Sequence, residues 1–314
     1  MTLIVKTSSL GDILQTFSSL AFLKQHGPID WVVEKRFAPL LHAHPDIRHV
    51  IEIDSKAWPQ GLLTLRKTLR SNSYERLYDL QGNCKSALIT LLAKAKRKIG
   101  YTLKTAPEWP NALATNQRYP QTPYLDFVKN TFPPTSFTFS GVQLKNAQDI
   151  SIPENAIMIC PGSRWPSKQL STTTWQKLLE AIPSPRILIY GSEQEKQVAQ
   201  TLKQDEDLIF GNLDYSTWQQ MMAKCIGVIA VDSSALHLCA TTNTPSFSIF
   251  GPSHPDIYKP KGCQHAHFFA PCPLGQTFTK RCPRLRTCSA PCTKAINVHD
   301  LSTSINHWLN SIKH

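Results

Sequence analysis

Short apolar segments alternate with segments of helical periodicity along most of the chain, in two separate series. In the first series, strands are predicted over 2–5, 29–33, 50–53, 76–79 and 97–100, with helices near 13–25, 37–42, 60–71 and 84–92. This alternation is typical of a parallel sheet that helices cover on both faces. Because such sheets bind ligands beyond the carboxyl ends of their strands, polar residues directly after a strand are the candidate functional residues.

A second series of the same kind follows a proline-containing stretch at 105–123, a helix near 125–130 and Phe132-Pro133-Pro134. Its strands are predicted over 156–160, 187–190, 208–210, 227–231 and 246–250, with helices near 173–181, 193–204, 215–224 and 235–241. At 314 residues the chain is long enough for two domains of ordinary size. We therefore predict an α/β protein with two doubly wound parallel-sheet domains, 1–150 and 151–297.

The last segment, 298–314, is predicted to be an amphipathic helix. Six apolar residues stand there at helical spacing: Val298, Leu301, Ile305, Trp308, Leu309 and Ile312. Packing against a domain is the expected role, and a membrane-surface role is the alternative. The longest apolar run, near 88–92, is far short of the ~20 residues that cross a bilayer, and no signal-peptide pattern opens the chain. We therefore expect a cytoplasmic protein.

Positive charge is concentrated in the first half of the chain. Residues 1–145 carry 19 Lys or Arg against 10 Asp or Glu, whereas residues 146–314 carry 15 against 12, within a total net charge of +12. The first half is thus expected to face an acidic partner, such as nucleic acid, anionic lipid or a phosphorylated or carboxylated acceptor. The sequence shows neither a recognition helix nor aromatic residues interleaved with basic ones, so we do not expect nucleic acid as the partner.

The loop after the first strand is a small polar cluster, Lys6-Thr7-Ser8-Ser9-Leu10-Gly11-Asp12. We expect Gly11 to permit a tight turn and Asp12 to stand where the next helix begins. Two interpretations of Asp12 remain open at this point. It is either an N-cap that satisfies free amides of the helix or a functional carboxylate at the ligand-binding edge of the sheet.

Three clusters of the second half suit one anionic ligand. The segment 161–168 follows a strand and combines a glycine with hydroxyls and two cations, 232–237 joins a strand to a helix start, and 250–255 ends the next strand with a turn. Backbone amides and the positive end of a helix dipole attract phosphate. His237 could donate to the same phosphate, and Glu193 could accept from ribose hydroxyls, although both residue types are also common in helices for structural reasons.

The nine cysteines of the chain are expected to be free thiols or metal ligands rather than disulfides. Four of them lie within one short segment: Cys272, Cys282, Cys288 and Cys292. Their gaps differ from the paired C-x-x-C spacing of common zinc sites. We therefore expect a cysteine-rich loop, and a zinc or redox role for these cysteines is the alternative.

Six short motifs, in this order, make the chain resemble the lipopolysaccharide heptosyltransferases of glycosyltransferase family 9. They are 5–12, 30–34, 78–86, 161–163 with Lys168, 231–237 and 250–253. The first motifs are most similar to heptosyltransferase I, which adds heptose to Kdo on lipid A. The resemblance implies a GT-B fold, with the acceptor in the first domain, the donor nucleotide in the second and the segment 298–314 crossing back to pack on the first.

The activity that the resemblance implies is inverting transfer of heptose from ADP-L-glycero-D-manno-heptose to Kdo, without a metal or other cofactor. One general base suffices, because the diphosphate leaves without an acid. A metal-free site must instead neutralise the diphosphate with amides and cations. The acceptor implies a protein bound peripherally at the inner face of the inner membrane. We also expect a monomer.

Individual roles follow from the resemblance, position by position. Asp12 matches the catalytic base. The acceptor residues that it implies are Thr7, Ser8, Ser9, Gly11, Gln81, Lys85 (toward a Kdo carboxylate) and Ser86, with Lys56, Arg66, Lys67 and Arg70 for lipid A phosphates. The donor residues are Ser163, Lys168, Asp232, Ser233, Ser234 and His237, with Glu193 beside ribose and Leu213 beside adenine.

Two departures from the family pattern bear on specificity. The family usually has glycine at the position of Ser234. The serine side chain keeps the backbone further from the diphosphate than glycine would. The loop at 163–168 is more similar to heptosyltransferase II than to I. Three alternatives therefore stay open: a heptosyl acceptor, another nucleotide sugar, or a non-catalytic nucleotide- or lipid-binding scaffold.

Overall fold

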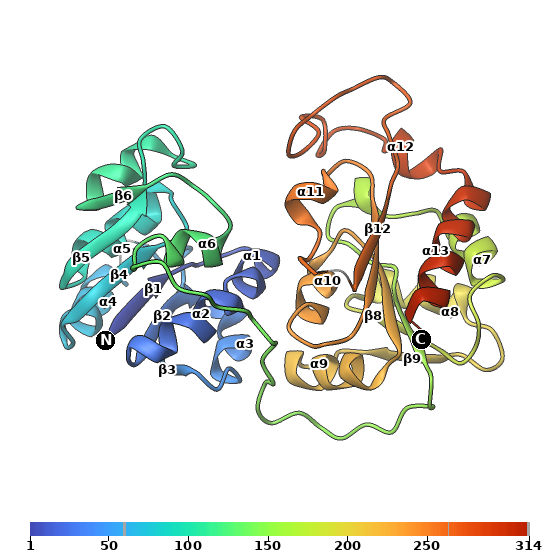
Figure 1. Cartoon of the computed structure of the whole chain (residues 1–314), viewed down its shortest axis with the longest axis horizontal. Helices are drawn as coiled ribbons and strands as arrows, with labels where there is room; N and C mark the ends of the chain where they lie inside the picture. The colour runs from blue at the N-terminus through green and yellow to red at the C-terminus, as the bar shows by residue number, and fades with distance from the viewer. Residues whose placement is uncertain (59–60, 263, 313–314) are drawn as a thin grey trace. The chain divides into compact units, whose positions relative to one another are not determined.

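The computed structural model describes residues 1–58, 61–262 and 264–312. The described chain forms two compact units, 1–145 and 146–314. The division falls a few residues before the predicted one at 150. Each unit has the layered α/β architecture that the alternation predicts (Figure 1).

A six-stranded parallel sheet forms the centre of the first unit, in the order β3-β2-β1-β4-β5-β6. Its strands are β1 Thr2–Val5, β2 Ile29–Glu34, β3 Ile47–Ile53, β4 Tyr74–Asp79, β5 Ala95–Tyr101 and β6 Gln117–Tyr119. The chain first builds the sheet outward from β1 through β2 to β3 and then returns to place β4 on the other side of β1. The direction of winding therefore reverses between β1 and β4, which is where sheets of this kind bind ligands.

Helices cover both faces of this sheet. Helices α4 (Leu62–Arg70) and α5 (Cys84–Leu92) pack through Leu65, Leu69 and Ile89 on a face formed by alternate strand residues such as Val5. The opposite face carries α2 (Phe17–Leu23) and α6 (Tyr124–Lys129), which contact each other. The remaining helical elements are α1 Leu10–Gln15, η1 Lys24–His26, η2 Lys35–Phe37, α3 Ala38–His42 and η3 Trp109–Ala114.

The second unit repeats the same strand order around its own sheet, β12-β11-β10-β7-β8-β9. Its strands are β7 Ile157–Cys160, β8 Arg186–Tyr190, β9 Leu208–Gly211, β10 Gly227–Val231, β11 Ser246–Phe250 and β12 His265–Phe269. Its helical elements are η4 Pro166–Lys168, α7 Thr172–Leu179, α8 Glu193–Leu202, α9 Tyr215–Lys224, α10 Ser234–Cys239, α11 Pro255–Tyr258, α12 Pro291–Lys294 and α13 Val298–Ile312. The winding reverses here between β7 and β10, which correspond to β1 and β4 of the first unit.

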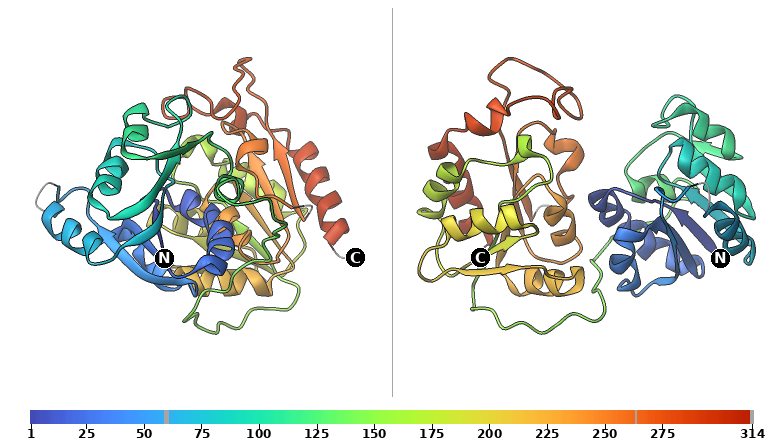
Figure 2. Two further views of the ribbon diagram at one scale, coloured as in Figure 1. Left: turned by 60° about the vertical axis from the view of Figure 1, so that its left-hand side comes forward. Right: turned by 180° about the vertical axis from the view of Figure 1, so that it is seen from behind.

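Helix α13 belongs to the core of the second unit, beside α7 (Figures 1 and 2). The rings of Trp308 and Phe247 lie 5.6 Å apart, and a Cβ atom on Gly227 would come within 2.7 Å of the Trp308 ring. This corrects the expectation that the segment 298–314 packs on the first domain, since its apolar face is already buried on β10 and β11. Residues 313 and 314 lie outside the described residues.

The predicted strands are present in the structure, and each sheet has one further strand at its edge. The added strands are β6 and β12, and each pairs with a single neighbour. Both escape prediction because they are short edge strands that contain polar residues and lack a continuous apolar run. The described helices include none that is long and apolar enough to cross a membrane.

Candidate active site

The loops after β1 and β4 meet at the point where the winding of the first sheet reverses. The side-chain oxygen of Gln81 accepts hydrogen bonds from the backbone amides of Thr7 and Ser8, at 3.0 and 3.1 Å. The buried carboxylate of Asp79 accepts from the amides of Gln81 and Gly82, at 3.1 and 2.9 Å. Two loops far apart in sequence are thus held together by polar contacts.

Asp12 lies in the first turn of α1, with Ser9 as the N-cap. Its Oδ2 atom accepts from the Ser9 amide at 3.1 Å and from the Ser9 hydroxyl at 2.7 Å. The N-cap interpretation of Asp12 is therefore wrong, because the helix begins at Leu10 and Asp12 is the acidic partner within the first turn. Gly11 is helical too, so it does not form the expected tight turn.

Lys6 and Tyr124 surround the Asp12 carboxylate. The Lys6 ammonium, on a side chain only 5% exposed, lies 3.9 Å from Asp12 Oδ2 and 5.2 Å from the centre of the Tyr124 ring. The Tyr124 hydroxyl donates to Asp12 Oδ1 at 3.4 Å. Burial lowers the pKa of Lys6, while the charges of Asp12 and Asp79 oppose that shift. Sequence reasoning did not assign a role to Lys6 or Tyr124; the place of Lys6 directly after β1 was the available signal.

The other predicted acceptor residues are spread over the first unit. Ser86 is fully buried, where it exchanges hydrogen bonds with Asn83 as part of the α5 capping box, at 2.9 and 3.1 Å. Its hydroxyl therefore stabilises a helix start and does not face an acceptor. Lys85 is exposed on the first turn of α5. The predicted phosphate-binding residues are exposed on α4 and the segment before it: Lys56, Arg66, Lys67 and Arg70.

Corresponding loops meet in the second unit, after β7 and β10. The hydroxyl of Ser163 donates to the carbonyl of Asp232 at 3.2 Å. Lys168 and Asp232, both largely buried, form an ion pair of 2.6 Å. The sequence did not indicate that these two predicted donor residues contact each other.

Two buried hydroxyls at this edge have no hydrogen-bond partner among the described residues, those of Ser233 and Ser253. Ser233 is the N-cap of α10, and Ser253 follows β11. A buried hydroxyl without a partner is unfavourable, so both suit a polar ligand at this position. Ser234 and the buried His237 lie on α10 itself.

Glu195, rather than Glu193, is the glutamate that reaches the strand ends. Its Oε2 atom accepts from the Gly191 amide at 2.7 Å, and a Cβ atom on Gly162 would come within 2.3 Å of its carboxylate. Glu193 is 74% exposed and pairs with Lys196 on the same helix. The expected ribose position of Glu193 is thus not supported by its geometry. Both glutamates lie in the first turn of α8, so sequence reasoning could not choose between them.

The ring of Tyr190, the last residue of β8, lies against Gly211, the last residue of β9. The ring of Tyr190 passes so close to Gly211 that a Cβ atom there would come within 2.0 Å of it. The half-buried Leu213 follows two residues later. The adenine position beside Leu213 stays a prediction.

The comparisons with known proteins identify the family of the chain. The model of glycosyltransferase family 9 (heptosyltransferase) matches residues 62–286, which is more than half of the chain. The chain belongs to glycosyltransferase family 9. It is accordingly a glycosyltransferase enzyme, and the resemblance to family 9 found in the sequence is confirmed.

Curated relatives extend over most of the chain. Lipopolysaccharide heptosyltransferase 1 of Pseudomonas aeruginosa is 27% identical over 308 residues, covering 89% of this chain and 86% of the relative. The protein of that name from Escherichia coli K12 is 25% identical, covering 81% and 89%. Lipooligosaccharide heptosyltransferase 2 of Haemophilus influenzae is also 25% identical, covering 82% and 85%.

Solved structures of family 9 share the fold. E. coli heptosyltransferase WaaC with ADP superposes with a TM-score of 0.80 at 21% identity, covering 98% of this chain and 99% of that one. E. coli ADP-heptose lipopolysaccharide heptosyltransferase II has a TM-score of 0.73 at 17% identity, covering 100% and 99%. The predicted GT-B fold is confirmed.

The cysteine-rich segment of this family 9 protein follows β12 and extends into α12, which contains Cys292. Cys282 and Cys292 are buried, and Cys272 and Cys288 are half-buried. Burial raises the pKa of the Cys292 thiol, and the neighbouring thiols of Cys272 and Cys288 add to the shift. Within the described ranges, no group of three or more His, Cys, Asp or Glu side chains is arranged to hold a metal ion. Cys263 lies outside those ranges.

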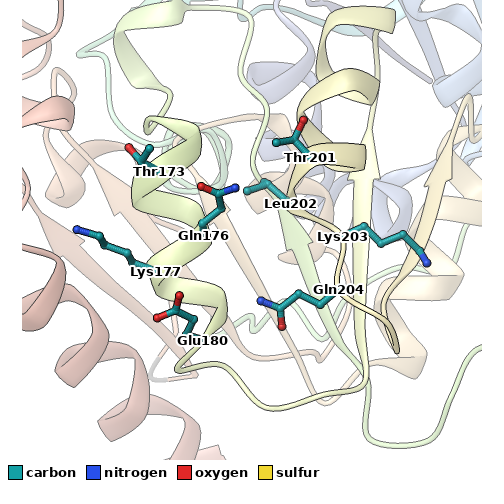
Figure 3. Close-up of a pocket in the computed structure, with 8 residues that line it drawn as sticks. All are labelled: Thr173, Gln176, Lys177, Glu180, Thr201, Leu202, Lys203 and Gln204. Carbon is teal, nitrogen blue, oxygen red and sulfur yellow. The ribbon is translucent and has the colours of Figure 1, made fainter.

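A surface hollow between α7 and α8 is not part of the site (Figure 3). Its wall comes from outer side chains of these helices, such as Gln176, Lys177 and Thr201. Gln204 on its rim bonds Arg186 at the start of β8, at the amino edge of the sheet. The hollow therefore lies away from the carboxyl ends of the strands, where the candidate residues are.

Proposed function

We propose that this enzyme transfers heptose from ADP-L-glycero-D-manno-heptose to Kdo of the lipid A core, in lipopolysaccharide biosynthesis, with inversion at the anomeric carbon. The observation that carries the proposal is the Asp12 carboxylate at the ligand-binding edge of the first sheet. It lies within contact distance of a buried ammonium and a phenol, and its side chain is 31% exposed. A partly exposed, oriented carboxylate suits a general base that removes the acceptor hydroxyl proton.

The donor nucleotide is assigned to the second unit. Lys168, Ser233, Ser234, His237 and the backbone beside Ser163 would hold the diphosphate, with Asp232 restraining the Lys168 ammonium. Their cation and hydrogen-bond donors are of the kind that stabilises a leaving diphosphate without a metal. No cofactor is proposed.

The nucleoside would lie across the ends of β8 and β9. Glu195 is placed to accept from ribose hydroxyls, since it already accepts from the Gly191 amide at this edge. The Tyr190 ring and Leu213 offer a surface for adenine. This assignment replaces Glu193 by Glu195.

The acceptor is assigned to the first unit. Thr7, Ser8, Ser9 and Gln81 would shape its site around Asp12, with Lys85 toward the Kdo carboxylate. The excess of positive charge in residues 1–145 supports an acidic acceptor. We further propose a monomer without nucleic-acid partners, cytoplasmic and bound peripherally to the inner membrane, where the acceptor is.

A second candidate acceptor is the heptose that heptosyltransferase II extends. The relatives named heptosyltransferase 2 are about as similar to this chain as the E. coli protein named heptosyltransferase 1. The donor and the base would be the same in both reactions. The candidates therefore differ only in the sugar that presents its hydroxyl to Asp12.

A panel of nucleotide sugars and acceptors tests the proposal, with product mass as the readout. We expect transfer from ADP-heptose to Kdo-lipid A. Transfer only to an acceptor that already carries one heptose would favour the second candidate. No transfer from ADP-heptose to either acceptor would overturn both.

A further inference from the structure

One face of α4 is basic and carries a protruding leucine. Leu63, Arg66, Lys67 and Arg70 follow one another at helical spacing and are exposed, Leu63 to 78%. Residues three, four and seven apart share a helix face. The buried side of the same helix is apolar, through Leu65 and Leu69. The basic residues therefore stand outward from the sheet.

Helix α5 and strand β5 extend this face. The Arg70 guanidinium donates to the carbonyl of Leu92 at 3.3 Å, and the Lys98 ammonium donates to the carbonyl of Leu91 at 3.5 Å. The Leu91 side chain is 57% exposed. We call this surface the α4–α5 patch; its residues are Leu63, Arg66, Lys67, Arg70, Leu91 and Lys98. Figures 1 and 2 show the two helices side by side on the same face of the sheet.

The cations of the α4–α5 patch lack acidic partners. Among the described residues, no carboxylate forms an ion pair with Arg66, Lys67, Arg70 or Lys98, whereas the nearby Lys96 pairs with Glu75 at 2.9 Å. The pKa of Lys98 is lowered by burial and further by the charge of Arg70. The four cations of the patch therefore repel one another without a paired carboxylate in the described chain, and an extended anionic surface would reduce this repulsion.

We propose that the α4–α5 patch docks on an anionic phospholipid bilayer, with its cations at the lipid phosphates and Leu63 and Leu91 inserted at the interface. Basic residues contribute additively to binding at an anionic leaflet, and exposed leucines gain by leaving water there. Leucines would have no role against nucleic-acid phosphates. This inference deepens the peripheral membrane association of the proposed function, and it is independent of which sugar is transferred.

Vesicle flotation with the full chain tests the docking surface. The vesicles are phosphatidylglycerol mixed with phosphatidylcholine, phosphatidylcholine alone, and phosphatidylcholine containing lipid A. We expect binding to the first kind, weak binding to the second, and weaker binding to the first at high salt. The combined variant Arg66→Gln, Lys67→Gln, Arg70→Gln should lower the partition coefficient roughly 100-fold.

A charge-matched control separates the patch from overall charge. Lys145→Gln, Lys177→Gln and Lys203→Gln remove three exposed cations elsewhere and should change the partition by less than about threefold, because they lie off the patch. The pair Leu63→Ser, Leu91→Ser should weaken binding about tenfold or more and leave transfer to a delipidated, water-soluble acceptor unchanged. Thermal unfolding of each variant shows whether it remains folded.

Three results would overturn the docking surface. The wild type binds phosphatidylglycerol vesicles no better than neutral ones; the control loses as much binding as the patch variant; or binding requires lipid A in the vesicle. If the wild type does not transfer heptose to the soluble acceptor, that result counts against the proposed function and not against the docking surface. The two proposals therefore fail by different measurements.

Discussion

The ammonium of Lys6, whose side chain is almost entirely buried, lies 3.9 Å from the carboxylate of Asp12. A buried cation beside a carboxylate favours the ionised carboxylate and restricts its orientation. The carbonyl of Lys6 also accepts from the Trp31 indole at 2.9 Å, which holds the lysine backbone in place. Lys6 is therefore a positioning residue for the proposed base.

Replacement of the base should strongly lower turnover and leave the donor site intact. We expect Asp12→Asn to lower kcat by about 10²- to 10⁴-fold, because a general base is lost. ADP binding, measured by calorimetry, should be unchanged, since the donor residues belong to the second unit. Asp54→Asn, at an exposed carboxylate of the first unit, is the control. Full activity of Asp12→Asn would disprove the assignment.

Replacement of Lys6 should shift the pH dependence of kcat. In Lys6→Met the Asp12 carboxylate loses a neighbouring positive charge, so the acidic limb of the kcat profile should move to higher pH. Lys35→Met, at an exposed lysine, should not move it. A purely structural role for Lys6 predicts lower kcat at every pH with no shift of the limb. The measurement is kcat from pH 5 to pH 9.

The two glutamates of α8 should differ in their effect on the donor. Glu195→Gln should raise the KM for the nucleotide sugar about tenfold, as expected for loss of a charged hydrogen-bond acceptor. Glu193→Gln should change it by less than about twofold, because that side chain is exposed. Equal effects of the two substitutions would contradict the placement of ribose beside Glu195.

The buried Arg186–Asp207 pair should stabilise the second unit without touching its site. Arg186 donates to Asp207 at 2.8 Å, and the two side chains are at most 2% exposed. Asp207→Asn leaves a buried cation without its partner and should lower the free energy of unfolding by about 3–5 kcal/mol. The exposed Asp205→Asn is the control. Urea unfolding measures both, and equal midpoints would contradict the prediction.

Protonation of His265 should destabilise the protein in acid. Burial lowers its pKa to about 4, and its Nδ1 atom lies 2.8 Å from the Ser246 hydroxyl. Below its ordinary pKa of 6.5 the unfolded chain takes up a proton that the folded ring does not. Stability from this residue is therefore full above pH 6.5 and falls toward pH 4, by at most about 3 kcal/mol.

Urea unfolding at several pH values checks this slope. His265→Gln should lose less stability than the wild type between pH 6.5 and pH 4. His299→Gln, at an exposed histidine, should follow the wild type. The same slope in all three proteins would show that His265 does not contribute.

The sequence by itself determined the layered architecture and the strand ends that carry the polar loops. This is possible because the alternation of apolar strands with helices is local, and consecutive segments report it directly. The motifs around Asp12, Lys168 and Asp232 were visible for the same reason, since each follows a strand without a break. The edge strands β6 and β12 were not, because polar residues interrupt both and neither forms a continuous apolar run.

Only the tertiary structure decided which side chains meet. The contacts of Gln81 with Thr7, of Lys168 with Asp232 and of Lys6 with Tyr124 join residues that are distant in sequence. It also decided that Glu195 rather than Glu193 lies over Gly162, and that α13 packs on the second sheet. A local sequence pattern shows that a helix has an apolar face or that a residue carries a charge. The partner of that face or charge depends on how distant segments pack together, and no local pattern contains this information.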